Sequence, residues 1–236
     1  MMKFLNWNTE WAKPGSVRGR RVAETIQKQA PNLGCFSEAY PETLPADGYL
    51  ISSSDDTGYT NDGGRRKVFL WSREPWSEEW RAEETTLPGG RFVSGVTAGI
   101  RCVGLCIPWR MAHVNTGRRD RKPWEDHIVY LEALQSILSG FLALPEPLLV
   151  TGDWNQRIPR TRQPEEAFEL LQCALAGLEV TSTGVPKSFD EPLIDHLAVS
   201  PQIQCSALDP IPSRDSDGKP LSDHVGFTAV IEILKS

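Results

Sequence analysis

Short apolar runs separated by polar or glycine-rich segments recur along most of the chain. They cover residues 4–8, 33–38, 68–71, 92–100, 102–107, 148–151, 193–199 and 225–234. In the last run, alternate positions are apolar and fall on one side of an extended chain: Val225, Phe227, Ala229 and Ile231. Runs of this kind predict β-strands, and residues 111–114 are expected to continue the sheet pattern.

Three other segments are predicted to be helices. Val22 and Ile26 follow Ser16, a favourable helix N-cap, and Pro31 is expected to stop this first helix. The second helix carries four apolar residues on one face: Ile128, Leu131, Leu134 and Leu138. A third helix is predicted to begin near Pro164, because two glutamates follow it where the helix dipole favours negative charge.

Helical and strand patterns are mixed along the chain, and many stretches look antiparallel. No repeat of fixed period, no low-complexity segment and no long linker divides the sequence. A chain of 236 residues can bury a core without disulfides or a structural metal. We therefore expect one α+β domain over residues 1–236, with two sheets packed face to face and helices outside them.

The charge balance limits the kind of surface that the chain can present. With 25 basic and 31 acidic residues, the net charge is −6. This balance argues against a broad basic surface that binds duplex nucleic acid by counterion release. It does not exclude a nucleic-acid substrate, because bound divalent cations add positive charge that the formal count omits.

Cysteine usage and hydropathy indicate a cytoplasmic protein. The five cysteines include no CxxC pair, so we expect buried free thiols in a reducing compartment rather than a zinc site. Residues 1–11 lack the long apolar run of a signal peptide, and no window is apolar enough to cross a membrane. We expect no membrane partner, and nothing indicates an obligate protein partner.

Polar side chains recur where the predicted strands end. One aspartate after a strand is usually a turn or a helix cap, but six such positions in one chain are harder to explain in that way. Because strands of a packed sandwich bring their ends together, these groups could converge on one pocket. They are Asn8, Glu38, His113 with Asn115, Asp153 with Asn155, Asp195, and Asp223 with His224.

The residue types fit hydrolysis of a phosphate ester. Carboxylate and amide oxygens such as those of Glu38 and Asn8 suit Mg²⁺ or Mn²⁺ rather than zinc. A histidine with a buried aspartate partner is held in one tautomer and can carry positive charge. An aspartate beside an asparagine can orient and deprotonate water while the amide donates to a phosphoryl oxygen.

These segments, in this order, resemble the endonuclease/exonuclease/phosphatase (DNase I-like) superfamily. The resemblance runs from residue 5 to residue 224, and its strongest elements are Gly-Asp-Trp-Asn at 152–155 and Ser-Asp-His at 222–224. The weakest is Ala-His-Val-Asn at 112–115. The resemblance implies a four-layer α/β/β/α sandwich, with two facing β-sheets flanked by helices, and a Mg²⁺-dependent phosphodiesterase, with Mn²⁺ as the other candidate metal.

The resemblance also implies a role for each motif residue. The metal residues would be Glu38 as main ligand, Asn8 as a helper, and Asp223 near the metal shell. Asp153 would position and activate water. His224, with Asp195 as its partner, would contact the phosphate or act as acid and base, and Asp153 and His224 are assigned as one unit. Asn155 and His113 would contact phosphate. One departure is His196, where the family often has an aromatic residue; we expect a hydrogen-bonded core histidine there.

Two basic clusters are candidate substrate contacts. Arg118, Arg119 and Arg121 follow the His113 motif, and Arg65, Arg66 and Lys67 precede a predicted strand. A solvated surface loop is an equal alternative for the first cluster and the favoured one for the second. Trp109 is a candidate surface for stacking a base, whereas Trp154 is expected to support the site from below.

Three functions remain open from the sequence. The first is hydrolysis of phosphodiester bonds in nucleic acid. The second is hydrolysis of a phosphorylated small molecule or lipid-linked phosphate ester by the same groups. The third, a catalytically silent binding module of the same fold, is disfavoured because the carboxylates and the histidine are all present.

Overall fold

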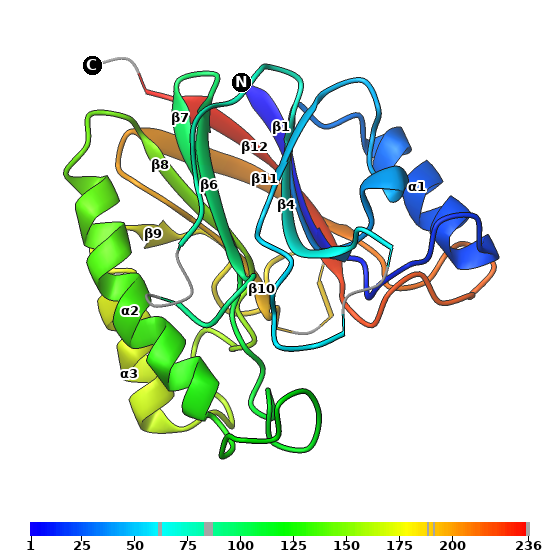
Figure 1. Ribbon diagram of the computed structural model, residues 1–236. Coiled ribbons are helices and arrows are strands. Elements are labelled where there is room, and N and C mark those ends of the chain that lie inside the picture. Colours follow the sequence, from blue (N-terminus) through cyan, green and yellow to red (C-terminus); the bar gives the residue numbers. More distant parts are fainter. Residues whose placement is uncertain (61–62, 83–86, 188, 191, 235–236) are drawn as a thin grey trace.

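The computed structural model describes residues 1–60, 63–82, 87–187, 189–190 and 192–234, and Figure 1 shows their arrangement. Two mixed sheets of six strands face each other. The first has the strand order β11-β12-β1-β2-β4-β3, and the second has the order β5-β6-β7-β8-β10-β9. The strands of the first sheet are β1 (Met2–Asn8), β2 (Leu33–Ala39), β3 (Tyr49–Ser52), β4 (Arg66–Ser72), β11 (Ile203–Ile211) and β12 (Gly226–Ile233). Those of the second are β5 (Ser77–Trp80), β6 (Phe92–Thr97), β7 (Ile100–Cys106), β8 (Leu148–Asp153), β9 (Glu179–Val180) and β10 (Asp195–Val199).

The helices form the two outer layers. Helix α1 (Val17–Gln29) covers the first sheet, whereas α2 (Glu125–Leu142) and α3 (Glu165–Ala174) cover the second (Figure 1). A short 3-10 turn spans Pro41–Thr43. Ser16 caps α1, because its hydroxyl accepts a hydrogen bond from the backbone N–H of Gly19 at 2.9 Å. The result is the four-layer α/β/β/α sandwich that the sequence predicts.

Alternation along the strands decides which residues face the other sheet. Phe4 on β1 lies in the core between the sheets, whereas Leu5 and Trp7 pack outward in the cluster that includes α1. On β8, Leu149 points to the inner core and Val150 packs in the cluster that includes α2. Asn8 and Asp153 lie four positions after Phe4 and Leu149, so they fall on the same inner faces.

Strand register then brings the polar ends to one end of the sandwich. Asp195 opens β10 and pairs directly with Asp153, the last residue of the antiparallel strand β8. In the other sheet, β12 runs antiparallel to β1, and Phe227 pairs with Asn6. His224 precedes β12 and therefore lies beside the end of β1. This end is opposite the two chain termini (Figure 1).

The structure differs from the sequence-based elements in two respects. Residues 111–114 form turns rather than strand, because the chain leaves the sheet after β7. Four strands were also not predicted from the sequence, and they are the outermost strands of the two sheets: β3, β5, β9 and β11. Edge strands are partly solvated and carry little apolar alternation; all four residues of β5, for example, are exposed.

Two other sequence-based expectations can be compared with the described residues. Cys35, Cys102 and Cys106 are buried free thiols as predicted, but Cys173 is exposed and Cys205 is only partly buried. Among the described residues, no helix has the length and hydropathy needed to cross a membrane.

Candidate active site

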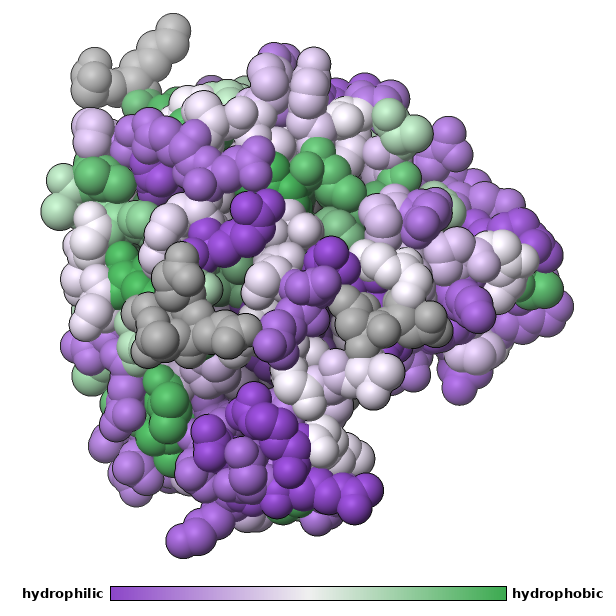
Figure 2. Space-filling model, in the orientation of Figure 1, coloured by the Kyte–Doolittle hydropathy of each residue, from purple (hydrophilic) through white to green (hydrophobic). Residues whose placement is uncertain are grey.

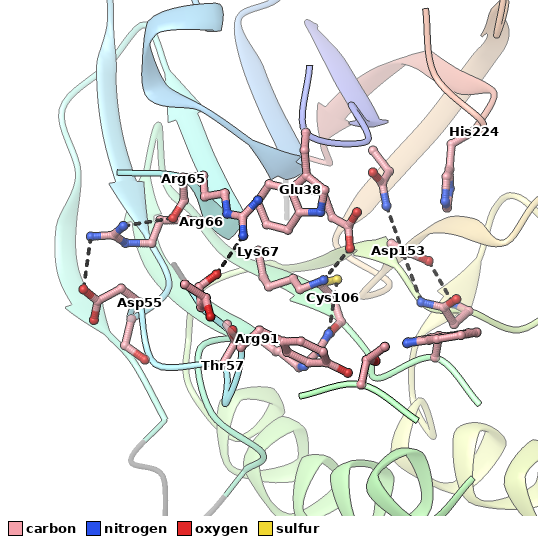
Figure 3. A pocket seen from close by; sticks show the side chains of 18 of the residues that line it. Glu38, Asp55, Thr57, Arg65, Arg66, Lys67, Arg91, Cys106, Asp153 and His224 are labelled. Atoms are coloured by element: carbon pink, nitrogen blue, oxygen red, sulfur yellow. Dashed lines mark hydrogen bonds and ion pairs between the residues drawn. The ribbon is translucent and has the colours of Figure 1, made fainter. Parts of the chain in front are cut away.

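A cavity of about 360 Å³ opens at the end of the sandwich where the polar strand ends meet (Figure 3). Most of the residues singled out from the sequence line it. They are Asn8, Glu38, Arg65, Asp153, Asn155, Asp223 and His224. Asp195 lies behind His224 rather than on the cavity wall, and this position suits a partner of the histidine.

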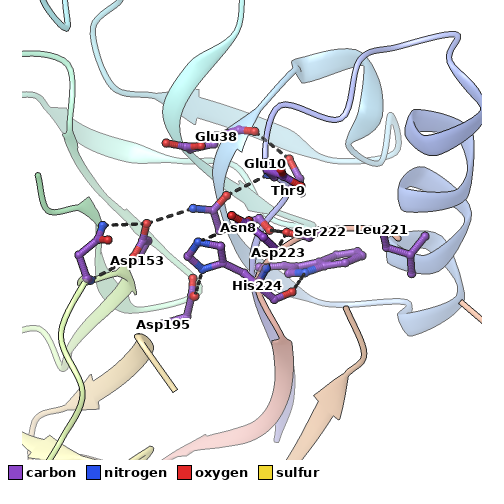
Figure 4. Close-up of polar contacts among 12 residues, drawn as sticks. Asn8, Thr9, Glu10, Glu38, Asp153, Asp195, Leu221, Ser222, Asp223 and His224 are labelled. Atoms are coloured by element: carbon purple, nitrogen blue, oxygen red, sulfur yellow. Dashed lines mark hydrogen bonds and ion pairs between the residues drawn. The ribbon is translucent and has the colours of Figure 1, made fainter. Parts of the chain in front are cut away.

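His224 and Asp195 form a buried pair at one end of the cavity (Figure 4). The Nδ1 atom of His224 lies 2.5 Å from Oδ2 of Asp195, and their side chains are 11% and 2% exposed. The carboxylate therefore fixes the tautomer of the ring and leaves Nε2 on the cavity side, where that atom lies 3.7 Å from Asp223. The side chain of Asp223 is itself 65% exposed.

Asp153 is held by hydrogen bonds from both sheets. Its Oδ2 accepts from the amide Nδ2 of Asn8 and from that of Asn155, each at 3.0 Å, and its Oδ1 accepts from the backbone N–H of Asn155. Asn155 also donates from Nδ2 to the carbonyl of Ile107 at 3.0 Å. Both amide hydrogens of Asn155 are thus engaged, so in this structure Asn155 orients Asp153, and a contact with phosphate requires one hydrogen bond to be exchanged.

Two motif residues fix the backbone around these groups. A Cβ on Gly152 would lie 1.9 Å from the carbonyl oxygen of Leu105, so only glycine fits the position before Asp153. Ser222 donates from its hydroxyl to the carbonyl of Asn8 at 2.6 Å and accepts from the backbone N–H of His224 at 3.1 Å. These contacts explain why Gly-Asp and Ser-x-His are the strongest elements of the sequence pattern.

Glu38 faces the cavity from the first sheet and forms an ion pair with Lys67 of β4 (Figure 3). Its backbone adopts a positive φ of 48°, an unusual conformation between the paired residues Ser37 and Ala39. Its carboxylate and that of Asp153 both line the cavity, with the Asn8 amide beside Asp153. This set of hard oxygen donors fits a divalent cation such as Mg²⁺ or Mn²⁺.

A tighter group of candidate ligand atoms lies next to that set. Among the described residues, Asp153, Asp195 and His224 offer ligand atoms that all lie within 4.8 Å of one another. Nearby carboxylates raise the pKa of His224 to about 10, so both ring nitrogens carry protons at neutral pH and offer no lone pair to a metal. Among the residues predicted from the sequence, Glu38 and Asp153 are therefore the ones that could hold a metal.

Charges in the cavity shift two pKa values in ways that matter for chemistry. Burial raises the pKa of Asp153 to about 7, and the negative charges of Asp195 and Glu38 act in the same direction, against the lowering effect of His224. For His224, burial disfavours the charged ring, but Asp195 and Asp153 outweigh it and raise its pKa to about 10. The imidazole is therefore protonated at neutral pH.

These shifts predict that the metal-free protein loses stability as pH rises. The stability contributed by His224 is complete below its ordinary pKa of 6.5 and is lost as pH rises through about 10. The contribution of Asp153 to stability changes with pH in the same direction, because its pKa of about 7 in the folded protein exceeds its ordinary value of 3.8. Between pH 7 and 8.5 we expect the free energy of unfolding in EDTA to fall by roughly 1 kcal/mol per pH unit.

Urea unfolding across this pH range is the measurement. The double variant Asp195→Asn with His224→Gln removes the titrating pair, so its stability should change much less between the two pH values. If the free energy of unfolding of the double variant falls with pH as steeply as that of the wild type, other groups cause the pH dependence.

The predicted middle motif does not reach the cavity wall. The His113 side chain is 3% exposed and stacks on Tyr59, with ring centroids 4.4 Å apart. Its Nε2 lies 3.0 Å from the carbonyl of Thr57, and its Nδ1 accepts from the backbone N–H of Arg118 at 3.1 Å. Because both ring nitrogens are engaged by backbone groups, His113 orders a loop in this structure and does not contact the cavity.

The arginine cluster after His113 also lies outside the cavity lining. Arg121 donates from Nε to Asp126 at 2.6 Å, Arg118 lies near both Asp120 and Asp126, and Arg119 is exposed. The loop between β7 and α2 carries these residues, and it projects as a hydrophilic surface at the lower end of the molecule (Figure 2). Of the two predicted basic clusters, the second lines the cavity, with Arg65, Arg66 and Lys67.

Two cavity residues were not predicted from the sequence. Arg91 adds positive charge, and Trp11 adds an aromatic wall on which the Arg65 guanidinium stacks at 4.6 Å from the ring centroid. Each is an isolated residue in its own segment, so only the fold reveals that they join the cavity. Trp109 lines the cavity and Trp154 is fully buried, which agrees with their expected places. His196 is fully buried, and its ring contacts Ser182 and the carbonyl of Gln156 as expected.

Solved structures with this fold cover almost the whole chain. An AP endonuclease from Archaeoglobus fulgidus has a TM-score of 0.71 and 16% identity, over 99% of this chain and 100% of that chain. A 3'-5' exonuclease from Neisseria meningitidis has a TM-score of 0.69 and 16% identity, over 99% and 100%. A 3' phosphatase from Neisseria bound to a product DNA hairpin has a TM-score of 0.70 and 15% identity, over 98% and 100%.

Sequence comparison gives a family but no individual relative. A search of curated proteins finds no significant match. The model of the Endonuclease/Exonuclease/phosphatase family, however, matches residues 5–224, the span over which the strand-end motifs occur. The chain therefore belongs to the endonuclease/exonuclease/phosphatase family.

Proposed function

We propose that the chain is a Mg²⁺-dependent phosphodiesterase that cleaves nucleic acid. The observation that carries this proposal is the convergence of the His224–Asp195 pair with Asp153 and Glu38 in one cavity. Enzymes of the family are generally dependent on divalent metals. The similar structures described above are named as an AP endonuclease and as one Neisseria protein, NExo, that is called a 3'-5' exonuclease and a 3' phosphatase and is bound in one structure to a product DNA hairpin.

The side chains have complementary roles in this proposal. A metal held by Glu38 and Asp153, with the Asn8 amide beside them, would polarise a phosphoryl oxygen when bound. Asp153 orients the attacking water, because Asn8 and Asn155 hold its carboxylate in place. The protonated His224 ring, aligned by Asp195, donates from Nε2 to the phosphoryl group as negative charge develops there.

The rest of the cavity favours a nucleic-acid substrate over a small ester. Trp109 lines it and is 45% exposed, and an aromatic face of this kind stacks bases without regard to sequence. Arg65 and Lys67 add positive charge on the side away from His224, where a flanking phosphate could lie (Figure 3).

A substrate panel with Mg²⁺, with Mn²⁺ and with EDTA tests the proposal. It contains single-stranded and duplex DNA, RNA, a generic phosphodiester, a phosphomonoester and an inositol phosphate. We expect metal-dependent cleavage of at least one nucleic acid, and loss of that cleavage in Asp153→Asn. Asp217→Asn, on an exposed loop, is the matched control and should keep it.

The other outcomes are equally informative. Cleavage of the small esters alone would move the chain to hydrolysis of a phosphorylated small molecule or lipid. A folded protein that cleaves nothing in the panel would support a binding module of the same fold.

A further inference from the structure

Arg91 is a buried cation on the cavity wall whose charge is not matched by a carboxylate. The residue is 3% exposed and precedes β6. Its Nη1 donates to the carbonyl of Cys106 at 3.3 Å, and its Nη2 has no hydrogen-bond partner. Among the described residues, no acidic side chain forms an ion pair with it. Guanidinium groups stay charged in proteins, and a buried charge without a partner is costly. An anion that accepts a hydrogen bond from Nη2 would offset this cost.

The position of Arg91 indicates where such an anion would lie. Arg91 is backbone-paired to Cys106 of β7, and Cys106 in turn pairs with Asp153 of β8. The backbones of Arg91 and Asp153 are thus two strand spacings apart, about 10 Å. Arg91 and His224 lie at different places on the cavity wall (Figure 3), so an anion on Arg91 would be distinct from the phosphate that His224 approaches.

Other groups near Arg91 favour an anion in the same place. Burial raises the pKa of the Cys106 thiol, the carboxylates of Asp153 and Glu38 act in the same direction, and the nearby charges of Lys67 and Arg91 oppose them. Arg65 also lines the cavity, and it donates to the carbonyl of Thr60 rather than to a carboxylate. Figure 3 shows Arg91 beside Cys106 and Lys67, and away from His224.

We infer that Arg91 is the anchor of a second anion subsite, which binds a phosphate group of the substrate other than the one that is attacked. This inference deepens the proposed function, because it requires a substrate with two phosphate groups. Such a substrate is either a nucleotide chain with a phosphate beside the scissile bond or a small molecule that carries two phosphates. In both cases Arg91 binds this second phosphate and positions the substrate, and it takes no part in bond cleavage.

Matched substrate pairs test the subsite. The dinucleotide TpT is compared with pTpT and with TpTp, and an inositol monophosphate is compared with a bisphosphate. We expect the extra phosphate to raise kcat/KM roughly tenfold to a hundredfold in one series, mainly through KM, as befits charge-assisted hydrogen bonds. The series that responds identifies the source of the phosphate.

Variants locate the effect at Arg91. Arg91→Met should remove the advantage of the extra phosphate while leaving the poorer substrate of the pair almost unchanged, and Arg91→Lys should restore part of it. Arg20→Met removes an exposed charge on α1 and is the control. If Arg91→Met lowers kcat/KM equally for both members of a pair, then Arg91 contacts the scissile phosphate. That result would overturn the second subsite.

A binding measurement separates this inference from the proposed function. Calorimetry with pyrophosphate and metal-free protein needs no turnover, and wild type should bind more tightly than Arg91→Met. Binding that depends on Arg91, in a protein that cleaves nothing, would keep the subsite and reject the phosphodiesterase. If Arg91→Met binds pyrophosphate as tightly as the wild type, and thermal unfolding shows both proteins folded, the subsite is rejected and the proposed function is not.

Discussion

Replacement of His224 by alanine is expected to lower turnover by roughly 10³-fold on whichever substrate the protein cleaves. The ring is aligned by Asp195 at 2.5 Å and leaves Nε2 on the cavity side. The nearby carboxylates raise its pKa to about 10, so it remains a proton donor throughout the neutral range. A water molecule in its place would have neither the fixed position nor the positive charge.

The same substitution should also destabilise the protein, for a reason that lies in Asp195. The Asp195 side chain is 2% exposed, and its Oδ1 already has no hydrogen-bond partner among the described residues. Without His224, a buried carboxylate loses its counter-charge, and such a loss typically costs about 3 kcal/mol or more. Adding Asp195→Ala to His224→Ala should therefore recover most of the stability and none of the activity.

Urea unfolding and single-turnover kinetics on the two single variants and the double variant provide the test. The interaction between the two positions should appear as a large coupling free energy in stability. Near-normal turnover in folded His224→Ala would remove the histidine from the mechanism. If the double variant is as unstable as His224→Ala, then the loss of stability does not come from the unpaired carboxylate.

The sequence is sufficient to predict which residues meet at the His224 end of the cavity, because strand alternation and register are local and regular. Asn8 and Asp153 follow inward-facing core residues at even spacing, so their side chains must point between the sheets. Asp195 pairs with Asp153 across adjacent strands, and Ser222 fixes His224 against β1. These relations explain why motif order alone gave a correct family and a correct sandwich.

The remaining residues of the cavity depend on long-range packing that no local pattern encodes. His113 has the residue type of a phosphate contact, but the chain turns after β7 and both ring nitrogens bind backbone groups. Arg118 and its neighbours form a dense basic cluster, yet their partners are acidic residues of their own segment. Arg91 is a lone arginine after two glycines in the sequence, and only its burial without a carboxylate makes it conspicuous.

Lys67 and Glu38 should have opposite effects on metal affinity. Lys67 holds the carboxylate of Glu38, and the two side chains are only 12% and 21% exposed. A divalent cation on Glu38 must share or replace this contact, and it is repelled by the ammonium group. At about 4 Å in water, unit charges interact by about 1 kcal/mol, so a divalent ion and a lysine oppose each other by about twice that amount.

We therefore expect Lys67→Met to tighten Mn²⁺ or Mg²⁺ binding about tenfold, and Glu38→Gln to weaken it by at least as much. Calorimetry on the metal-free protein measures both directly, with Lys28→Met on the exposed face of α1 as the control for charge loss. Weaker metal binding in Lys67→Met would show that the lysine positions Glu38 rather than competing for it. Tighter binding together with a lower kcat/KM would show that the ammonium group moves from the carboxylate to the substrate. In that case, one cation holds the site together in the metal-free protein and then binds phosphate once the metal has taken its place.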